Sequence, residues 1–382
     1  MKFNRYALSD LATIKYGKNQ KKVLSENGNI PIYGTGGLMG YATTALYDKP
    51  SVLIGRKGTI GKVKYVEQPF WTVDTLFYTI INTDLVIPKY LFYVMSLIDL
   101  NNYNEGTTIP SLRTETLNRL EFDIPDLEEQ RKILSCLNPI DEKIELNNAI
   151  NNNLEQQAQA IFKSWFIDFE PFGGVQPPEM KFVPLQELCK VVTKGTTPTT
   201  LGKPFTSSGI NFIKAESILD SHSIDSSKFA FIDEETNALL KRSVIKANDI
   251  VFTIAGTLGR FAMVDNSVLP ANTNQAVAII RPDEKKVTPA YLYSFFIGNW
   301  HNEYYSKRIQ QAVQANLNLT TIKSLPIAVL SNTTMNNYDE LVSPLFALMK
   351  GNEEENRRLS ELRDTLLPKL MSSELDVSNI EF

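Results

Sequence analysis

The feature that most constrains the fold of this chain is an internal repeat. The segment LSDLATIKYGKN, which begins at Leu8, matches LQELCKVVTKGT, which begins at Leu185, with a slip of one residue before the glycine. The segment GTTIPSLRTETLNRL of residues 106–120 matches AVQANLNLTTIKSL of residues 312–325. Because each copy of a repeated sequence is expected to form the same structural unit, the chain of 382 residues is predicted to contain two similar globular domains.

A glycine-rich block lies within each copy. SVLIGRKGTIGKV, residues 51–63, matches DIVFTIAGTLGRF, residues 249–261, so that Lys62 corresponds to Arg260. Apolar runs, TLFYTII and AVAII, follow the two blocks. Short runs of β-branched and aromatic residues between glycines and prolines are typical of strands, so the block predicts a tight hairpin. The glycine-rich block can also be interpreted as a ligand-binding loop, because glycines let the backbone approach a ligand closely.

Each copy ends in a helical pattern. Asp126 is expected to cap the first helix, with Glu129 three residues later, because this arrangement satisfies free amides at a helix start. Asn138-Pro139 and Gly351 are expected to break or kink the two helices into a short and a long piece. Residues in steps of three and four predict the buried faces: Ile133, Leu137, Ile140, Ile144, Asn147, Ile150, Leu154, Ala158, Ile161 and Trp165, then Leu341, Leu345, Leu348, Asn352, Asn356, Leu359, Leu362, Leu366 and Leu370.

These patterns together predict an α+β protein. Two globular α/β domains, related by a pseudo-two-fold axis, are expected to be separated by two long antiparallel helices that form a coiled coil. The expected ranges are 1–125 and 180–330 for the globular domains, and 126–172 and 335–372 for the helices. A helix of about 25–30 residues is roughly 40 Å long, which is close to the ~34 Å of one DNA turn.

A group of asparagines in the first helix has two interpretations. If they face the partner helix, they set the register of the pair at some cost in stability. A solvated face is an equally good interpretation for most of them. The group consists of Asn147, Asn148, Asn151, Asn152 and Asn153.

The composition favours an ordinary globular protein, with 43% hydrophobic and 21% charged residues. No apolar run approaches the roughly 20 residues needed to cross a bilayer, and the start lacks the apolar core of a secretory signal, so we expect a cytoplasmic protein without membrane contact. Cys136 and Cys189 lie far apart, and with only two histidines they cannot supply a four-ligand zinc site without carboxylates. No metal site is therefore expected.

The sequence lacks the motifs of catalytic and nucleotide-binding sites. The glycines of residues 34–40 do not match GxGxxG, and Gly61-Lys62 is followed by valine, so it is not a phosphate-binding P-loop. Neither histidine is accompanied by a GxSxG motif. The net charge of −4 argues against a generally basic nucleic-acid binder, but basic residues gather in residues 15–22 and 56–64 and acidic ones in 123–145. This segregation suits a non-catalytic DNA reader attached to a protein-binding scaffold.

Several blocks resemble the specificity (S, HsdS) subunits of type I restriction-modification enzymes. The most specific are EEQRKIL, which begins at Glu128, and FKSWFIDFEPF, which begins at Phe162. Departures from the family pattern are Asp126 in place of a second proline, Ala255 where the first copy has Lys57, and the loss of the EQ pair from LSNTTMNNYDELV. Further matching blocks are YGTGG, IGRKGTIGKV, VDTLF and IPDLEEQRKIL in the first half, and GTTPTT, NDIVFTIAGTLGR, Asn274-Gln275 and LRDTLLPKL in the second.

The resemblance implies a role in DNA recognition. Each globular domain would be a target recognition domain that reads one half of a bipartite, asymmetric site in double-stranded DNA. The helices would set the spacing and dock two methyltransferase (M) subunits, and restriction/translocase (R) subunits would join for cleavage. S-adenosylmethionine, ATP and magnesium would then bind to the partner subunits, with no cofactor on this chain. Two alternatives stay open: a specificity subunit of a Type IIB-like enzyme, and a coiled-coil adaptor unrelated to DNA.

Candidate site residues are drawn from the repeated loops and the aromatic block. Basic side chains suit phosphates and guanine, and hydroxyl groups can hydrogen-bond to bases or phosphates. The candidate DNA contacts are Lys18, Tyr33, Thr35, Arg56, Lys57, Thr59 and Lys62 in the first copy, and Lys194, Thr197, Lys214, Ser217, Thr257 and Arg260 in the second. Large aromatics dominate interface energetics, so Phe162, Trp165 and Phe166 are candidate partner contacts, with packing in the protein core as the alternative.

Overall fold

The computed structural model describes residues 2–298, 300 and 317–377 and divides into two compact units. The first unit comprises residues 1–145 and 355–382, and the second comprises residues 146–354. Two helices of 40 residues, α4 (Leu127–Phe166) and α10 (Asn332–Met371), each contribute one part to each unit. Residues 312–316 of the repeated segment lie outside the described residues.

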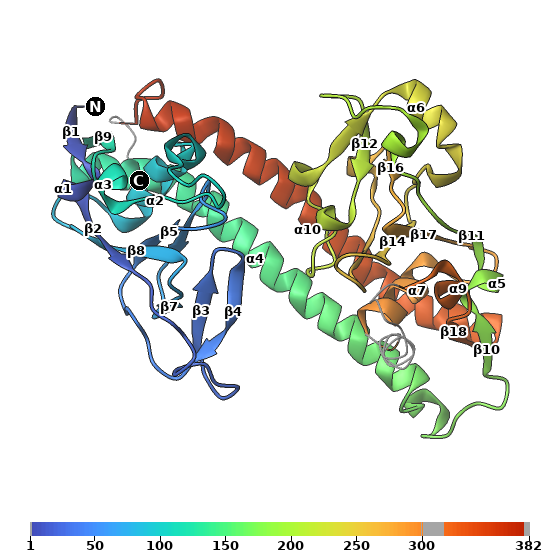
Figure 1. Ribbon diagram of the computed structural model, residues 1–382. Helices are drawn as coiled ribbons and strands as arrows, with labels where there is room; N and C mark the ends of the chain where they lie inside the picture. The colour runs from blue at the N-terminus through green and yellow to red at the C-terminus, as the bar shows by residue number, and fades with distance from the viewer. Residues whose placement is uncertain (1, 299, 301–316, 378–382) are drawn as a thin grey trace. The chain divides into compact units, whose positions relative to one another are not determined.

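Each unit contains three small sheets and several short helices (Figure 1). The first unit contains β1 (Phe3–Ala7), α1 (Leu8–Leu11), β2 (Ala12–Tyr16), β3 (Ile30–Gly34), β4 (Gly37–Ala42), β5 (Ser51–Gly55), β6 (Val63–Val66), β7 (Trp71–Thr72), β8 (Leu76–Ile81), α2 (Pro88–Ser96), α3 (Thr114–Asn118) and β9 (Glu121–Pro125). The second contains β10 (Lys181–Pro184), α5 (Leu185–Leu188), β11 (Cys189–Lys194), β12 (Ile210–Ile213), β13 (Ala230–Ile232), α6 (Glu234–Leu239), β14 (Ile250–Thr253), β15 (Phe261–Met263), β16 (Ala271–Thr273), β17 (Val277–Pro282), α7 (Pro289–Ile297), α9 (Leu319–Lys323) and β18 (Pro326–Val329).

The strand order is the same in the two units. The four-stranded sheet runs β2-β8-β5-β6 in the first unit and β11-β17-β14-β15 in the second. In the three-stranded sheets, β4-β3-β7 and β13-β12-β16, the middle strand is antiparallel to one neighbour and parallel to the other. The two-stranded sheets β1-β9 and β10-β18 are also equivalent. The α+β class and the two similar domains predicted from the repeat are therefore confirmed.

The core of each unit lies between its four-stranded sheet and helices. In the first unit, Val52 and Ile54 of β5 are buried with Tyr90 and Leu91 of α2. Parts of both long helices complete this core with Ile133, Leu134, Leu137, Leu367 and Leu370. In the second unit the rings of Phe252 in β14 and Phe296 in α7 have centroids 5.6 Å apart, and the long helices again contribute buried side chains.

The two long helices run antiparallel where they meet within each unit. In the first unit, Arg363 of α10 donates a hydrogen bond of 3.2 Å to Asp141 of α4. In the second, the amide of Asn352 donates to the side-chain oxygen of Asn151 at 2.7 Å, and Asn151 donates to the Met349 carbonyl at 3.2 Å. Asn151 therefore faces the partner helix and Asn147 is fully buried, whereas the side chains of Asn148, Asn152 and Asn153 are exposed.

The predicted start of the first long helix is confirmed, but the predicted breaks within the two long helices are absent. The Glu129 amide donates to the Asp126 carboxylate at 2.9 Å, as expected of a cap. Both helices are continuous through Pro139 and Gly351, so neither is broken into two separate helices there, and of the predicted break or kink only the break is wrong. The buried side chains of Leu137 and Ile140 lie on either side of Pro139, and their packing outweighs the local preference of proline.

The predicted buried face of the second helix is also partly wrong. Leu341 and Leu348 are about half exposed, at 48% and 51%, and Leu362 is 47% exposed. Asn352 and Leu370 are buried as predicted, and the other buried positions are Tyr338, Val342, Phe346, Met349 and Leu367. Two apolar series, offset by one residue, run along this helix, and periodicity alone cannot select between them. Packing against α7 determines which series is buried, because Tyr293 of α7 packs edge-on against Phe346 with ring centroids 5.1 Å apart.

Within the described residues, no helix combines the length and apolar character that a membrane span requires.

Pro139 offers a test of the continuous helix. Because proline removes a helical hydrogen bond and crowds the preceding turn, Pro139→Ala is expected to stabilise the chain by about 1–3 kcal/mol. Chemical denaturation measures this change, with the exposed Glu142→Ala in the same helix as the matched control. A loss of stability on removing the proline would show that the packing of this helix depends on it.

Candidate nucleic-acid interface

Three loops meet at one end of the four-stranded sheet in the first unit. Tyr16, the last residue of β2, pairs with Phe77 near the start of β8, and Phe77 also pairs with Ile54 near the end of β5. The residues that follow β2 and β5 and precede β8 therefore lie together. We call residues 17–18, 56–62 and 73–75 the first loop end.

The second unit has an equivalent group of loops. Lys194, at the end of β11, pairs with Ala278 of β17, and Thr253, at the end of β14, pairs with Val277. We call residues 195–197, 254–260 and 274–276 the second loop end. In the repeat alignment it occupies the place of the first loop end.

A close backbone approach builds both loop ends in the same way. A Cβ atom on Gly17 would lie 2.0 Å from the carbonyl oxygen of Val73, and one on Gly195 would lie 1.8 Å from that of Thr273. Only glycine fits at such distances, which gives a physical reason for the matched glycines in the sequence repeat. Gly58 and Gly256 are also equivalent, with left-handed φ angles of 86° and 80°, respectively.

The first loop end exposes several cationic and hydroxyl side chains. Lys18, Lys57, Thr59 and Lys62 are exposed, and no ion pair to these lysines is found within the described residues. Arg56 is more constrained than they are: its guanidinium lies 5.0 Å from the centre of the Tyr16 ring and donates to the Asp74 carbonyl at 2.8 Å. The lysines therefore remain available to a polyanion, whereas Arg56 mainly connects its own loop to Tyr16 and Asp74.

The turn between β3 and β4 contributes two candidates with different surroundings. Thr35 is half-buried, and its hydroxyl would lie 3.9 Å from a Cβ atom on Gly58, so the turn borders the glycine loop. Tyr33 is only 8% exposed, and the ammonium group of Lys64 lies 4.1 Å from the centre of its ring. Partial desolvation lowers the pKa of Lys64. Tyr33 is a core residue in this conformation, so its position does not support a direct DNA contact.

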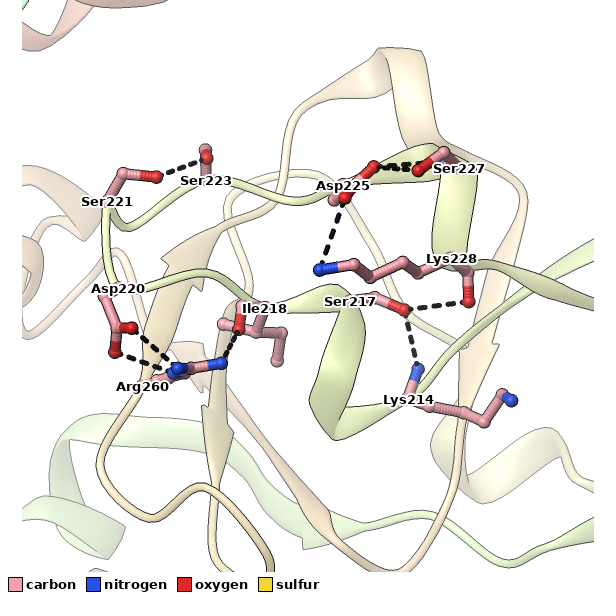
Figure 2. A network of polar contacts seen from close by, with 10 residues as sticks. All are labelled: Lys214, Ser217, Ile218, Asp220, Ser221, Ser223, Asp225, Ser227, Lys228 and Arg260. Carbon is pink, nitrogen blue, oxygen red and sulfur yellow. Dashed lines mark hydrogen bonds and ion pairs between the residues drawn. The ribbon is translucent and has the colours of Figure 1, made fainter. Parts of the chain in front are cut away.

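Arg260 in the second loop end has carboxylate and carbonyl partners (Figure 2). Its Nε and Nη2 atoms donate to the two carboxylate oxygens of Asp220 at 2.7 and 2.6 Å. Its Nη1 atom donates to the carbonyl of Ile218 at 3.4 Å. Arg260 therefore differs from Lys62, its counterpart in the repeat, because its charge is already paired.

The loop around Arg260 is held from beneath by a buried threonine. Thr253 Oγ1 accepts a hydrogen bond from the Arg260 amide at 2.9 Å and donates to the carbonyl of Thr257. The side chain of Thr257 is exposed. The glycine block thus forms the tight connection between β14 and β15 that the sequence predicted, with Thr257 at its surface.

Two candidates of the second unit lie in the segment that follows β12. Lys214 forms an ion pair of 3.1 Å with Glu216. Ser217 is fully buried, and its hydroxyl donates to the Lys228 carbonyl at 3.3 Å (Figure 2). Ser217 is therefore engaged inside the loop, and a direct DNA contact is not supported by its position.

A basic residue that the sequence analysis missed lies beside the remaining candidates. Arg242 donates at 3.4 Å both to the Lys194 carbonyl and to the Thr196 hydroxyl. The hydroxyl of the half-buried Thr197 bonds to Gln275, and the side chain of Lys194 is exposed. Arg242 lies outside the repeated blocks, so no pattern in the sequence indicated it.

The aromatic block FKSWF is part of the protein core. Phe162 and Phe166 are only 2% and 4% exposed, and their ring centroids lie 5.9 and 5.0 Å from that of Tyr291 in α7. Trp165 is half-buried and packs edge-on against Tyr338 with centroids 5.6 Å apart. The positions of Phe162 and Phe166 favour the core alternative over a docking surface, because a buried ring has no area left for a partner.

The cationic and hydroxyl groups of the loop ends suit binding of a polyanion. Among the residues that the structure describes, no cluster of three or more histidine, cysteine, aspartate or glutamate side chains is arranged to hold a metal ion. The free thiols of Cys136 and Cys189 are half-buried, and burial raises the pKa of both.

Comparison with known proteins finds the same two copies. A model of the type I restriction modification DNA specificity domain matches residues 2–156 and 177–330. The chain is 26% identical over 373 residues to the type I restriction enzyme HindI specificity subunit of Haemophilus influenzae, covering 77% of this chain and 79% of that protein. It is 27% identical over 358 residues to the type I restriction enzyme MjaIX specificity subunit of Methanocaldococcus jannaschii, covering 88% and 80%.

A solved structure shares the fold. The S subunit of a type I restriction-modification system from M. genitalium superimposes with a TM-score of 0.55 at 16% sequence identity. The similarity covers 97% of this chain and 96% of that one. At this identity the likeness concerns the fold alone.

Replacing Phe162 tests the assignment of the aromatic block to the core. Phe162→Ala is expected to lower the free energy of unfolding by about 3–5 kcal/mol, because it leaves a cavity among packed rings. Denaturation experiments measure the loss, and Ile167→Ala, at a side chain that is 42% exposed, is the matched control with little expected effect. Unchanged stability with lost binding of a methyltransferase subunit would instead assign the ring to an interface.

Proposed function

Because the chain belongs to the family of type I restriction-modification DNA specificity domains, we propose that it selects the DNA site on which such a complex acts. In this proposal each unit binds one half of a bipartite site in double-stranded DNA through its loop end. The observation that carries the proposal is the duplication of one topology, with a loop end in each copy that exposes basic or hydroxyl side chains. Two similar frames with different loops suit two different half-sites.

The contacts of the first loop end are assigned to the DNA backbone. Lys18, Lys57 and Lys62 are exposed lysines on short loops, and an ammonium group there can displace counterions from phosphates. Thr59 can add a hydrogen bond to a phosphate or a base edge. In the second unit the corresponding groups are Lys194, Thr197 and Thr257, together with Arg242.

The long helices supply the rest of the proposed role. They link the two units twice, and we assign to them the spacing of the half-sites and the docking of two methyltransferase subunits. Restriction/translocase subunits would join this assembly for cleavage. The chain itself is proposed to be non-catalytic, with S-adenosylmethionine, ATP and magnesium bound by its partners. The type I names of the matching relatives favour this assignment over a Type IIB-like system, and the family match favours it over an adaptor unrelated to DNA.

Mapping of DNA methylation tests the proposed function directly. Cells that contain the methyltransferase genes are expected to show methylation of one bipartite, asymmetric sequence when this chain is present and none of it when the gene is deleted. The same sequence should compete for binding of the purified complex to duplex DNA. Methylation that persists unchanged without the chain would contradict the proposal.

Charge removal at the first loop end tests the placement of the DNA. Each of Lys57→Gln and Lys62→Gln is expected to weaken binding about equally for all DNA sequences and to lower the slope of log affinity against log salt by about one. The exposed Lys49→Gln is the matched control, since Lys49 precedes β5 and lies at the opposite end of that strand. If Lys49→Gln changes the slope as much as Lys62→Gln does, the loop end is not the DNA surface.

A further inference from the structure

The connection between the first two strands of the three-stranded sheet differs strongly in length between the two units. In the first unit, β3 and β4 are joined by only Thr35 and Gly36. In the second unit the equivalent strands β12 and β13 are joined by residues 214–229. We call residues 214–229 the insert. Because the surrounding strands are in the same order in both units, the insert is a local addition to a common frame.

The insert has a defined internal structure (Figure 2). Ile218 and Ile224 form an antiparallel bridge, and the Leu219 amide donates to the Ser223 carbonyl at 3.0 Å. At its base the Asp225 amide donates to the Ser217 carbonyl at 2.8 Å. The side chain of Ile218 is fully buried and anchors this small hairpin to the core. The insert is therefore an ordered element that presents its tip in one arrangement.

Arg260, which precedes β15, and Phe261, the first residue of that strand, hold the tip of this hairpin. Arg260 donates through Nε, Nη1 and Nη2 to Asp220 and to the Ile218 carbonyl. The ring of Phe261 stacks on that of His222, with centroids 4.1 Å apart and an interplanar angle of 19°. Burial lowers the pKa of His222, which favours the neutral ring in this stack. The tip is thus fixed to the strand that follows the glycine loop of the second loop end.

The ion pair between Arg260 and Asp220 changes what this loop can do with DNA. The side chain of Arg260 is 26% exposed and that of Asp220 is 80% exposed. Seen from a DNA phosphate, the positive charge of Arg260 is largely cancelled by the negative charge of Asp220. This loop therefore attracts a polyanion less than the equivalent loop of the first unit, which carries Lys62. A bidentate arginine fixes direction as well as distance, which a lysine cannot do.

The exposed part of the insert has groups that can read base edges. Asp220 and Ser221 are exposed at the tip, where the hydroxyls of Ser221 and Ser223 lie 2.9 Å apart (Figure 2). A carboxylate can accept from the amino group of cytosine, and a serine hydroxyl can donate or accept. Only two of the Arg260 donors contact Asp220, so lone pairs of the carboxylate remain for a second partner.

We propose that the insert reads bases of one half-site and that Arg260 is its positioning residue and not a DNA contact. This inference rests on the proposed function and assigns the specificity of the second unit to an element that the first unit lacks. Asp220 and Ser221 are the assigned base-reading side chains. Arg260 acts through Asp220 and the Ile218 carbonyl.

The test uses the full-length chain in complex with its methyltransferase subunits. Binding is measured to the mapped methylation sequence, to all its single-base variants, and over a range of salt. The variants are Arg260→Gln, Arg260→Lys, Asp220→Asn and the double variant Arg260→Gln/Asp220→Asn, with Lys62→Gln as the matched cation at the same place in the repeat. Thermal unfolding of each variant checks that the fold is kept. Replacement of Asp220 is expected to preserve the fold because its side chain is exposed.

Arg260→Gln, Arg260→Lys and Asp220→Asn are each expected to lose about tenfold or more in discrimination at base pairs of the same half-site. The double variant should lose no more than the worse single one, because both changes release the same tip. The salt slope should stay at the wild-type value for Arg260→Gln and fall by about one for Lys62→Gln.

Three results would overturn the inference. In the first, Arg260→Gln lowers the salt slope by about one and Arg260→Lys restores it, as expected for a phosphate contact. In the second, Asp220→Asn retains full discrimination in both half-sites. In the third, Arg260→Gln and Asp220→Asn relax discrimination in different half-sites. A wild-type complex that does not discriminate DNA sequences would overturn the proposed function itself, and this outcome is distinct from those three.

Discussion

The structure depends on one constraint: neither unit has a complete core without a helix from the other half of the chain. Leu367 and Leu370, near the C-terminus, are buried in the first unit with residues of its sheet. Phe162 and Phe166, at the end of α4, are buried in the second unit among α7 and α10. Each unit therefore contains buried side chains from both long helices. Neither half of the sequence can form its globular domain alone without losing core side chains that the other half supplies.

Much of this frame could be predicted from the sequence because it is duplicated. A repeat compares the chain with itself, so the sequence alone pairs Gly17 with Gly195 and Gly58 with Gly256. In the structure the first pair shares a close approach to a carbonyl oxygen, and the second pair shares a left-handed φ angle. Local patterns were less reliable where packing decides. Pro139 and Gly351 do not break their helices, because buried side chains lie on both sides of each: Leu137 and Ile140 in α4, and Met349 and Asn352 in α10. Periodicity alone does not choose between Leu341 and Val342 for the buried face.

The candidate site was harder to predict because the role of a charged side chain depends on its partner in space. Lys62 and Arg260 are equivalent in the alignment, yet only Arg260 has a carboxylate within reach, from a residue 40 positions earlier. Arg242 joins the second loop end through hydrogen bonds to residues 46 and 48 positions away, which no local motif reveals. Ser217 and Phe162 have the chemistry of contact residues, but burial assigns them to the interior.

The length of a connection and the identity of the nearby cation are physically related. An ion pair as exposed as that of Arg260 and Asp220 contributes only about 0–1 kcal/mol to stability, so its main effect is geometric. A long insert requires such a restraint, since each additional residue adds conformations that would have to be ordered on DNA binding. The two-residue turn at Thr35 needs no restraint, which leaves Lys62 free to bind phosphate. In this view the first loop end contributes mainly affinity, and the ordered insert contributes mainly discrimination.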